Sequence, residues 1–365
     1  MSDARFMAAA LALGRRNLGL TAPNPSVGAL VVQGERIVGA GATARGGRPH
    51  AETIALAEAG EAARGATVYV TLEPCSHHGV TPPCAEALVA AGVGRVVCAL
   101  MDPDERVAGQ GLARLRAAGI AIEIGVGAEA ARRDHLGHIL RVTVKRPMVT
   151  LKLARTADGY AAGDEHDPRL TITGEIANRR TQTLRTMHEA IMVGVGTALG
   201  DDPLLTVRQS GLDQKPLRVV LDSRLSLPPD SRLCATAETY PTLVVTTPFA
   251  PVEREAELRA RGVEVERVGA GAQVDLREAL RLLGRRGVTR VFSEGGPTIG
   301  AALIRESLAD EVLLLTAEKP LGRPGRPALA ADALAALDDL GRYVEGPGAT
   351  YGADHLRRWE RHGAP

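Results

Sequence analysis

One stretch of the chain carries the residue types of a metal-dependent hydrolytic site. His50-Ala51-Glu52 precedes an apolar segment, and Pro74-Cys75 and Pro83-Cys84 follow it. One neutral imidazole and two thiolates make a three-ligand zinc set that leaves the fourth tetrahedral position to water, as in catalytic zinc sites. Zinc lowers the pKa of such a water to about 7. Glu52 could take a proton from the water and pass it to a departing amine.

The spacing of these residues matches the signature of zinc deaminases in part. That signature is His-x-Glu followed by Pro-Cys-x-x-Cys, whereas here Cys84 lies nine positions after Cys75. The longer loop still permits tetrahedral coordination if Cys84 begins a helix. The alternative is that both cysteines are ordinary buried residues and that His50 only starts a helix. An α/β sheet would bring all three motifs together, which favours the metal site.

The second half of the chain contains glycine-rich turns that suit a phosphate-bearing ligand. Gly194-Val195-Gly196-Thr197 follows an expected strand, although no clear helix is expected after it. Glu294-Gly295-Gly296-Pro297-Thr298 lies between an expected strand and a helix whose N-terminus would favour an anion. Asp201 and Arg208 place a carboxylate and a guanidinium close together in sequence. Taken alone, each of these features could equally be a turn or a surface ion pair.

Length and charge limit the kinds of protein that this chain can be. It has 365 residues, which suggests two domains or three. Lys and Arg number 44 and Asp and Glu 43, for a net charge of +1, so no nucleic-acid partner is expected. No apolar run approaches the roughly 18 residues of a membrane span, and no membrane partner is expected. Four cysteines are few for a secreted disulfide framework, and we expect a cytoplasmic protein with free thiols.

The hydrophobic pattern predicts two α/β domains, residues 1–145 and 146–365, because Pro147 ends a charged helix at the boundary. In the first domain it predicts a short helix that begins at Ala51 and further helices at 3–18, 84–91, 111–118 and 128–141. The strands predicted there are 27–32, 37–40, 66–72, 95–101 and 120–124. In the second it predicts strands at 148–154, 190–194, 217–222, 242–247, 263–268, 289–293 and 311–316, and helices at 174–188, 252–261, 275–286 and 298–306. Residues 321–327 are predicted to be a loop. Such alternation is typical of sheets covered by helices.

Several runs of the first half resemble one enzyme family. They are Thr71-Leu72-Glu73-Pro74-Cys75-Ser76-His77-His78-Gly79, Thr81-Pro82-Pro83-Cys84, Ala22-Pro23-Asn24-Pro25, Pro49-His50-Ala51-Glu52 and Val107-Ala108-Gly109. They are similar to the deaminase half of the bifunctional riboflavin-biosynthesis deaminase–reductases, in which the wide spacing of the two cysteines is itself a mark. The resemblance implies a cytidine-deaminase-like three-layer α/β/α domain. It also implies that His50, Cys75 and Cys84 bind zinc, that Glu52 is the catalytic proton shuttle, and that Asn24 contacts the pyrimidine beside His77 and His78.

Runs of the second half resemble the reductase half of the same family. They are Leu151-Lys152-Leu153-Ala154, Asp158-Gly159, Ile172-Thr173, Val193 to Thr197, Asp201 to Arg208, Leu221-Asp222-Ser223 and Glu294 to Thr298. The resemblance implies a dihydrofolate-reductase-like α/β domain that uses NADPH. The residues implied at the NADPH site are Ala154, Thr171, Thr197, Asp201, Gly296, Pro297, Thr298, Ile299, Gly300, Ala301 and Ala302. Those implied at the substrate are Arg169, Arg185, Leu205, Arg208, Ser223 and Glu294, with the arginines as phosphate forks.

Several positions depart from the family pattern, among them Glu105, which replaces a usual proline. Thr43 stands where many members have His, and Val80 stands where they have Lys or Arg. Thr171 replaces a tryptophan that would pack on the cofactor, and the preceding loop contains Arg169. Loss of the indole should weaken cofactor binding by about 1 kcal/mol or more, and Arg169 could compensate by pairing with a cofactor phosphate.

The resemblance implies a two-step enzyme of riboflavin biosynthesis. The first domain would hydrolytically remove the exocyclic 2-amino group of a diaminopyrimidinone ribosylamine phosphate, and the second would reduce the opened ribose to ribitol with NADPH. We expect one Zn²⁺ per chain, a small phosphorylated pyrimidine as substrate, and a homo-oligomer, either a dimer or a tetramer. One alternative is a deaminase whose second domain only binds or dimerises. The other is a metal-stabilised regulatory or binding protein without turnover, which would not need Glu52 beside its ligand.

Overall fold

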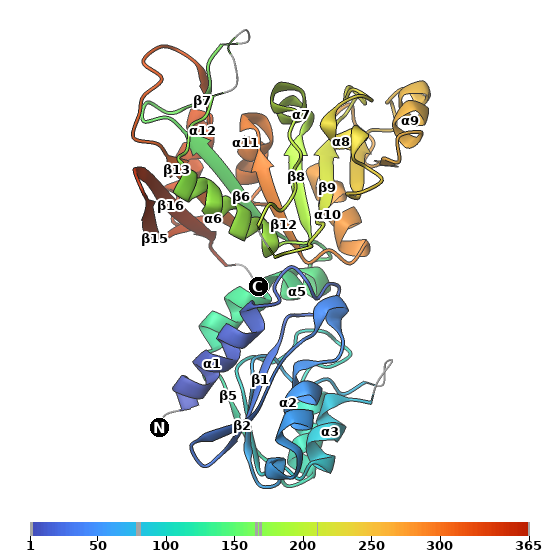
Figure 1. Ribbon diagram of the computed structural model, residues 1–365, viewed down its shortest axis with the longest axis vertical. Helices are drawn as coiled ribbons and strands as arrows, with labels where there is room; N and C mark the ends of the chain where they lie inside the picture. Colours follow the sequence, from blue (N-terminus) through green and yellow to red (C-terminus); the bar gives the residue numbers. More distant parts are fainter. Residues whose placement is uncertain (1–2, 78–81, 165–166, 168–169, 210, 364–365) are drawn as a thin grey trace. The chain divides into compact units, whose positions relative to one another are not determined.

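The computed structural model describes the chain except for residues 1–2, 78–81, 165–166, 168–169, 210 and 364–365. Its internal contacts divide the chain into two compact units, Met1–Lys145 and Arg146–Ala364, which are described one at a time (Figure 1). Within the described residues, no helix has both the length and the apolar character needed to cross a membrane.

The first unit is a five-stranded sheet between two layers of helices. Alternate side chains of β3 point to opposite faces, so Val68 and Val70 pack with Ala55 on one side while Tyr69 packs with Phe6 on the other. The strand order is β2 (Arg36–Ala42), β1 (Gly28–Gln33), β3 (Thr67–Val70), β4 (Arg95–Cys98) and β5 (Ala121–Ile124), the last three parallel. Helices α1 (Asp3–Arg15) and α5 (Ala128–Thr143) cover one face, and α2 (Ala51–Ala59), α3 (Cys84–Ala90) and α4 (Gln110–Ala117) cover the other. The predicted three-layer α/β/α architecture is confirmed.

Two glycines of β2 set the position of α2, the helix that carries Glu52. A Cβ added at Gly39 would lie 2.1 Å from the carbonyl oxygen of Ala55, and one at Gly41 would lie 2.1 Å from that of Ala51. Only glycine permits this approach of helix to strand. The short 3-10 helix η1 (Arg45–Gly47) lies between β2 and α2, and η2 (Gly60–Ala63) follows α2 directly.

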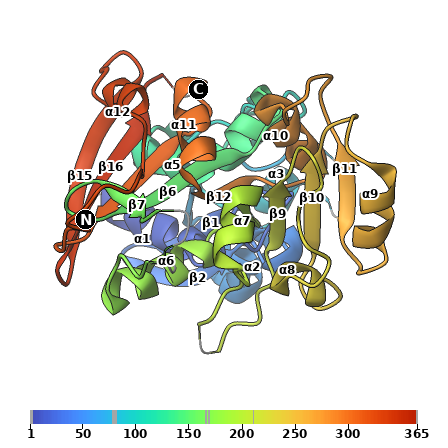
Figure 2. The same ribbon diagram turned by 90° about the horizontal axis from the view of Figure 1, so that it is seen from above.

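The second unit is built on a nine-stranded sheet that is parallel except at one edge. Figure 2 shows β11 and β15 at the opposite edges of this sheet. The order is β11 (Glu264–Arg267), β10 (Thr242–Thr246), β9 (Leu217–Leu221), β8 (Ala190–Gly194), β12 (Arg290–Gly295), β6 (Met148–Arg155), β13 (Glu311–Thr316), β16 (Asp354–Arg361) and β15 (Tyr343–Tyr351). Strands β16 and β15 run antiparallel to their neighbours, and β7 (Tyr160–Ala162) pairs separately with β14 (Arg326–Pro327).

Helices cover both faces of this second sheet. One face carries a core built with α10 (Leu276–Arg285), α11 (Pro297–Arg305) and α12 (Ala331–Leu337). The other carries a core built with α7 (Val195–Asp201), α8 (Arg232–Ala235) and α9 (Val252–Arg259). The remaining helix, α6 (Glu175–Thr186), leads through His188, which packs on Phe292, into β8. The expected α/β class of this unit is confirmed.

The structure differs from the elements predicted from the sequence in several places. Gly194 leads directly into α7, so the expectation that no clear helix follows this turn is wrong. The expected loop 321–327 ends in the short strand β14, which pairs with β7. The pattern also did not predict β7, α8, α12 or the β15–β16 hairpin. Strand β15 contains Gly346-Pro347-Gly348, and β16 carries charged side chains on its exposed positions, so neither has a continuous apolar pattern.

Candidate functional sites

The expected metal ligands come together where two helices begin. His50 is the N-cap residue of α2, Cys84 is the first residue of α3, and Cys75 lies in the loop between β3 and α3. Nδ1 of His50 lies 3.3 Å from Sγ of Cys84 and 3.7 Å from Sγ of Cys75. The three ligand atoms all lie within 4.8 Å of one another. An imidazole and two thiols that converge in this way fit the donor set of a catalytic zinc site.

Glu52 projects from the first turn of α2 and is 4% exposed. Burial raises the pKa of its carboxyl group to about 6, because the charged form loses its hydration. The hydrogen bond between the two thiols lowers the pKa of Cys75 to about 4 and raises the pKa of Cys84. A carboxyl group with this pKa beside the sulfurs is suited to exchange protons near neutral pH.

The loop that carries Asn24 packs against the residues that precede His50. Nδ2 of Asn24 donates a 2.9 Å hydrogen bond to the carbonyl oxygen of Gly47. A Cβ at Gly47 would lie 2.5 Å from that nitrogen, so a glycine is required there. Thr43 is buried, and its hydroxyl accepts a hydrogen bond from the N–H of Val27 at 3.0 Å. The expected loop residues His78 and Val80 lie outside the described residues.

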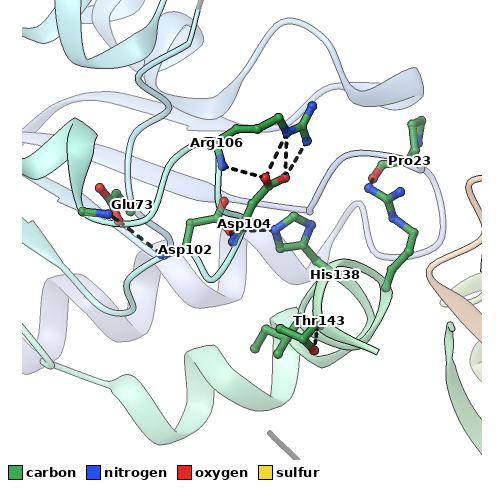
Figure 3. A network of polar contacts seen from close by, with 10 residues as sticks. Pro23, Glu73, Asp102, Asp104, Arg106, His138 and Thr143 are labelled. Carbon is green, nitrogen blue, oxygen red and sulfur yellow. Dashed lines mark hydrogen bonds and ion pairs between the residues drawn. The ribbon is translucent and has the colours of Figure 1, made fainter. Parts of the chain in front are cut away.

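Sequence reasoning assigned no role to a group of buried polar residues behind Cys75. The Glu73 carboxylate accepts hydrogen bonds from four backbone N–H groups of the segment 102–112. Within that segment Asp104 pairs with Arg106, and Asp102 contacts His138 of α5 (Figure 3). The sequence signal for Glu73 was its place directly before Pro74-Cys75, whereas His138 had no signal beyond its position in a helix.

Two glycine-rich turns of the second unit meet at one edge of its sheet. Strands β8 and β12 are parallel neighbours, so the turns that follow them lie side by side. Oγ1 of Thr197 lies 3.5 Å from the carbonyl oxygen of Gly295, and a Cβ at Gly296 would lie 2.7 Å from that hydroxyl. Gly295 and Gly296 have φ values of 68° and 83°, which glycine adopts most readily. Helix α11 begins here, and its N-terminal N–H groups suit the pyrophosphate of a dinucleotide.

A buried ion pair lies next to this turn. Nε and Nη2 of Arg185 donate to the two carboxylate oxygens of Glu294 at 2.5 and 2.9 Å, and Nη1 donates to the carbonyl oxygen of Thr206 at 2.6 Å. Burial acts to raise the pKa of Glu294, but Arg185, Lys152 and Arg208 outweigh it and hold that pKa below its ordinary value. Three cationic side chains around one carboxylate leave a positive region that suits a phosphate. Lys152 is a residue that sequence reasoning did not single out for the site.

The other residues expected in the reductase half lie on several elements. Ala154 is near the end of β6, and Asp201 is the last residue of α7. Leu205 is buried with a φ of 49°, and Thr171 is exposed before α6. The first residues of α11 are Pro297, Thr298, Ile299, Gly300, Ala301 and Ala302. Ser223 follows β9, and its hydroxyl donates to Gln273 and accepts from the N–H of Val274. Arg169 lies outside the described residues.

Comparison with known protein families matches each unit to a different domain. Residues 1–100 match the cytidine and deoxycytidylate deaminase zinc-binding region. Residues 147–340 match the RibD C-terminal domain. The two matches fall on the two sites described above.

Whole-length relatives carry both units in one chain. The riboflavin biosynthesis protein RibD of Escherichia coli is 38% identical over 357 residues, which cover 94% of this chain and 95% of the relative. That of Aquifex aeolicus is 38% identical and covers 88% of each chain. Among solved structures, RibD of Acinetobacter baumannii is 35% identical with a TM-score of 0.85, and a deaminase/reductase of Thermotoga maritima is 31% identical with a TM-score of 0.84; each comparison covers 98% of both chains.

Proposed function

The chain belongs to the RibD family of riboflavin-biosynthesis enzymes, and on that premise we propose which of its residues carry out the two reactions. It is a bifunctional enzyme with a diaminohydroxyphosphoribosylaminopyrimidine deaminase and a 5-amino-6-(5-phosphoribosylamino)uracil reductase in one chain. Its cofactors are zinc for the deaminase domain and NADPH for the reductase domain.

For the deaminase we assign His50, Cys75 and Cys84 as the zinc ligands. The observation that carries this assignment is the convergence of their three ligand atoms within 4.8 Å, beside a buried carboxyl group. When bound there, zinc supplies a water of lowered pKa. Glu52 would accept a proton from the attacking water and would donate a proton to the amino group, which leaves the pyrimidine as ammonia. Asn24, which Gly47 holds in place, orients the pyrimidine ring.

For the reductase we assign the turns at Thr197 and at Gly295-Gly296 as the cradle of NADPH. The close approach of the two turns supports this assignment, because a Cβ at Gly296 would fill the space between them. NADPH supplies the hydride, and the residues of this chain orient the two reactants. We further propose that Arg208 binds the substrate phosphate. Arg185 directs its donors to Glu294 and Thr206, and in this proposal it fixes Glu294 against the substrate.

A direct assay tests the reductase assignment. The chain is given the deaminated product, and NADPH oxidation is followed by absorbance. We expect steady oxidation by the wild type and a large loss in Arg208→Ala. Arg179→Ala, which removes an exposed arginine of α6, is the matched control and should keep the wild-type rate. Absence of oxidation by the wild type, with zinc-dependent deamination intact, would support a deaminase with an inactive second domain instead.

We also propose that the chain forms a homo-oligomer and acts in the cytoplasm. Strand β15 is at the edge of the nine-stranded sheet, and Val344 on it is 49% exposed; an edge strand can pair with another chain. None of the four cysteines forms a disulfide, as expected in a reducing compartment. Sedimentation of the purified chain with and without the substitution Val344→Lys tests the first proposal.

A further inference from the structure

Glu73 is a buried carboxylate that the deamination chemistry does not use. It is 4% exposed. Its Oε1 accepts hydrogen bonds from the N–H groups of Gly111 and Leu112 at 3.1 and 3.3 Å, and its Oε2 accepts from those of Gly109 and Asp102 at 3.0 and 3.3 Å. No cationic side chain pairs with it among the described residues. A buried charge is tolerated only when it is satisfied, and here backbone donors alone satisfy it.

These hydrogen bonds join the metal-ligand loop to a helix. Helix α4 begins after Gly109, which has no side chain to cap the first turn. The Glu73 carboxylate takes that place from a separate segment, where it bonds the free N–H groups and faces the positive end of the helix. Because Glu73 is two residues from Cys75, the cap also fixes the backbone that carries the thiol.

Further contacts hold the backbone on both sides of Cys75. A Cβ at Gly111 would lie 2.0 Å from the carbonyl oxygen of Pro74, so α4 packs directly on the ligand loop. The hydroxyl of Ser76 donates a 3.3 Å hydrogen bond to the carbonyl oxygen of Arg106. The carbonyl oxygen of Cys75 itself accepts from the N–H of Ala85, in the first turn of α3. The loop therefore has little freedom to move its sulfur.

The segment that Glu73 binds is anchored in turn by α5. Nε2 of His138 lies 2.9 Å from Oδ1 of Asp102, and the two side chains are 6% and 8% exposed (Figure 3). The same oxygen accepts a hydrogen bond from the N–H of Asp104 at 2.9 Å. An ionised carboxylate can only accept, so His138 donates in this contact. The chain of contacts thus runs from α5 through Asp102 and Glu73 to Cys75.

We propose that Glu73, supported by Asp102 and His138, fixes the loop that carries the metal ligand Cys75. These are positioning residues: they hold Cys75 so that the site retains its metal and keeps it in the reactive geometry. The proposal rests on the assignment of His50, Cys75 and Cys84 as ligands. Loss of an outer-shell partner typically costs roughly 10–100-fold in metal affinity or activity, and we expect a loss of that size here.

The test compares four variants of the full-length zinc enzyme. Glu73→Gln replaces one of the two carboxylate oxygens that accept backbone hydrogen bonds. His138→Leu removes the side chain that donates to Asp102, and His138→Gln restores a donor of similar length. Arg133→Gln, which breaks an exposed ion pair with Glu129 on α5, is the matched control. Each variant is measured for zinc release to a chromogenic chelator, for deaminase kcat and KM, and for reductase rate in the same chain.

We expect Glu73→Gln and His138→Leu to release zinc at least tenfold faster and to lose deaminase kcat, with KM within about twofold of the wild type. His138→Gln should recover most of the loss, and the reductase rate should stay unchanged in all four variants. Wild-type zinc release and kcat in His138→Leu, with only a lower thermal midpoint, would overturn the proposal. If Glu73→Gln does not fold, the comparison of His138→Leu with His138→Gln tests the proposal. Zinc release is measured without turnover, so it tests this proposal even if the wild type does not deaminate.

Discussion

Arg185 and Glu294 hold each other through two parallel hydrogen bonds, with side chains only 7% and 15% exposed. Arg185 lies in the last turn of helix α6 and Glu294 lies next to the last residue of strand β12, so the pair joins two elements that are far apart in sequence. A guanidinium fits a carboxylate in this bidentate geometry better than an ammonium group does. The pair is therefore both a structural connection and part of the proposed reductase site.

Replacement of Arg185 by Met should destabilise the reductase unit and abolish reduction. Removal of one partner leaves a buried charge unpaired, which costs about 3–5 kcal/mol. The double variant Arg185→Met with Glu294→Gln should recover much of the stability without recovering the reductase rate. Chemical denaturation and the NADPH assay measure the two effects separately. Reduction at the wild-type rate by the double variant would show that the pair serves only the fold.

Cys75→Ser should remove zinc and deamination and leave reduction intact, because the two reactions use separate units. Metal analysis of the purified chain should give one zinc per wild-type chain and little in the variant. Cys98→Ser is the control, since Cys98 is a buried cysteine of the same unit whose thiol only donates to the carbonyl oxygen of Leu100. Zinc retained in Cys75→Ser but lost in Cys98→Ser would contradict the ligand assignment.

Glu52→Gln should keep the metal and lose deamination by a factor of about 10² or more. The amide has almost the same shape as the carboxyl group but cannot shuttle a proton. Ammonia release measures the effect, and zinc content shows that the site is still assembled. Glu58→Gln, on the exposed side of the same helix, should behave as the wild type. Most of the ammonia release persisting in Glu52→Gln would mean that another group moves the proton.

The stability of the reductase unit should fall when the pH drops below about 6.5. Burial lowers the pKa of His188 to about 3, and its ring bonds the carbonyl oxygen of Leu184 and the hydroxyl of Thr150. In acid the unfolded chain therefore binds a proton that the folded chain does not. The stabilisation is complete above pH 6.5 and is lost toward pH 3, by up to about 1.4 kcal/mol per pH unit.

Urea denaturation of the wild type and of His188→Gln at pH 7 and pH 5 checks this prediction. The variant is expected to be less stable at pH 7 but to lose less on acidification. An equal loss in both proteins would mean that other groups set the pH dependence.

Thr171→Trp should tighten NADPH binding by about 1 kcal/mol, or roughly fivefold in Kd, if the indole packs on the cofactor. Thr171 is exposed before α6, so the larger side chain has space. Fluorescence titration with NADPH measures the affinity. Ile176→Trp, at a position that is 48% exposed, controls for the added aromatic surface. An unchanged Kd would mean that this segment does not touch the cofactor.

Much of the architecture follows from local sequence patterns. The buried strands of both sheets are short runs of Val, Leu and Ile, and the turn at the end of β12 contains Gly295 and Gly296, whose positive φ values favour glycine. Such signals depend on neighbouring residues and can be read from the chain. Among the elements that were missed, α7, α12 and the β15–β16 hairpin have glycine, proline or charged residues within them. Strand β16 forms because β13 is available as its partner, and α12 forms because its apolar residues pack on the core of the sheet.

The sites likewise contain residues that the sequence identifies and residues that only the tertiary structure identifies. His50, Glu52, Cys75 and Cys84 could be identified from residue type and spacing, because zinc chemistry restricts which side chains can serve. The roles of Glu73 and His138 could not, since a carboxylate or an imidazole in a helix or loop is usually a solvated group. Only the tertiary structure brings the α4 N-terminus to Glu73 and Asp102 to His138. Buried hydrogen bonds between distant segments depend on how the elements pack, and local sequence carries no record of that packing.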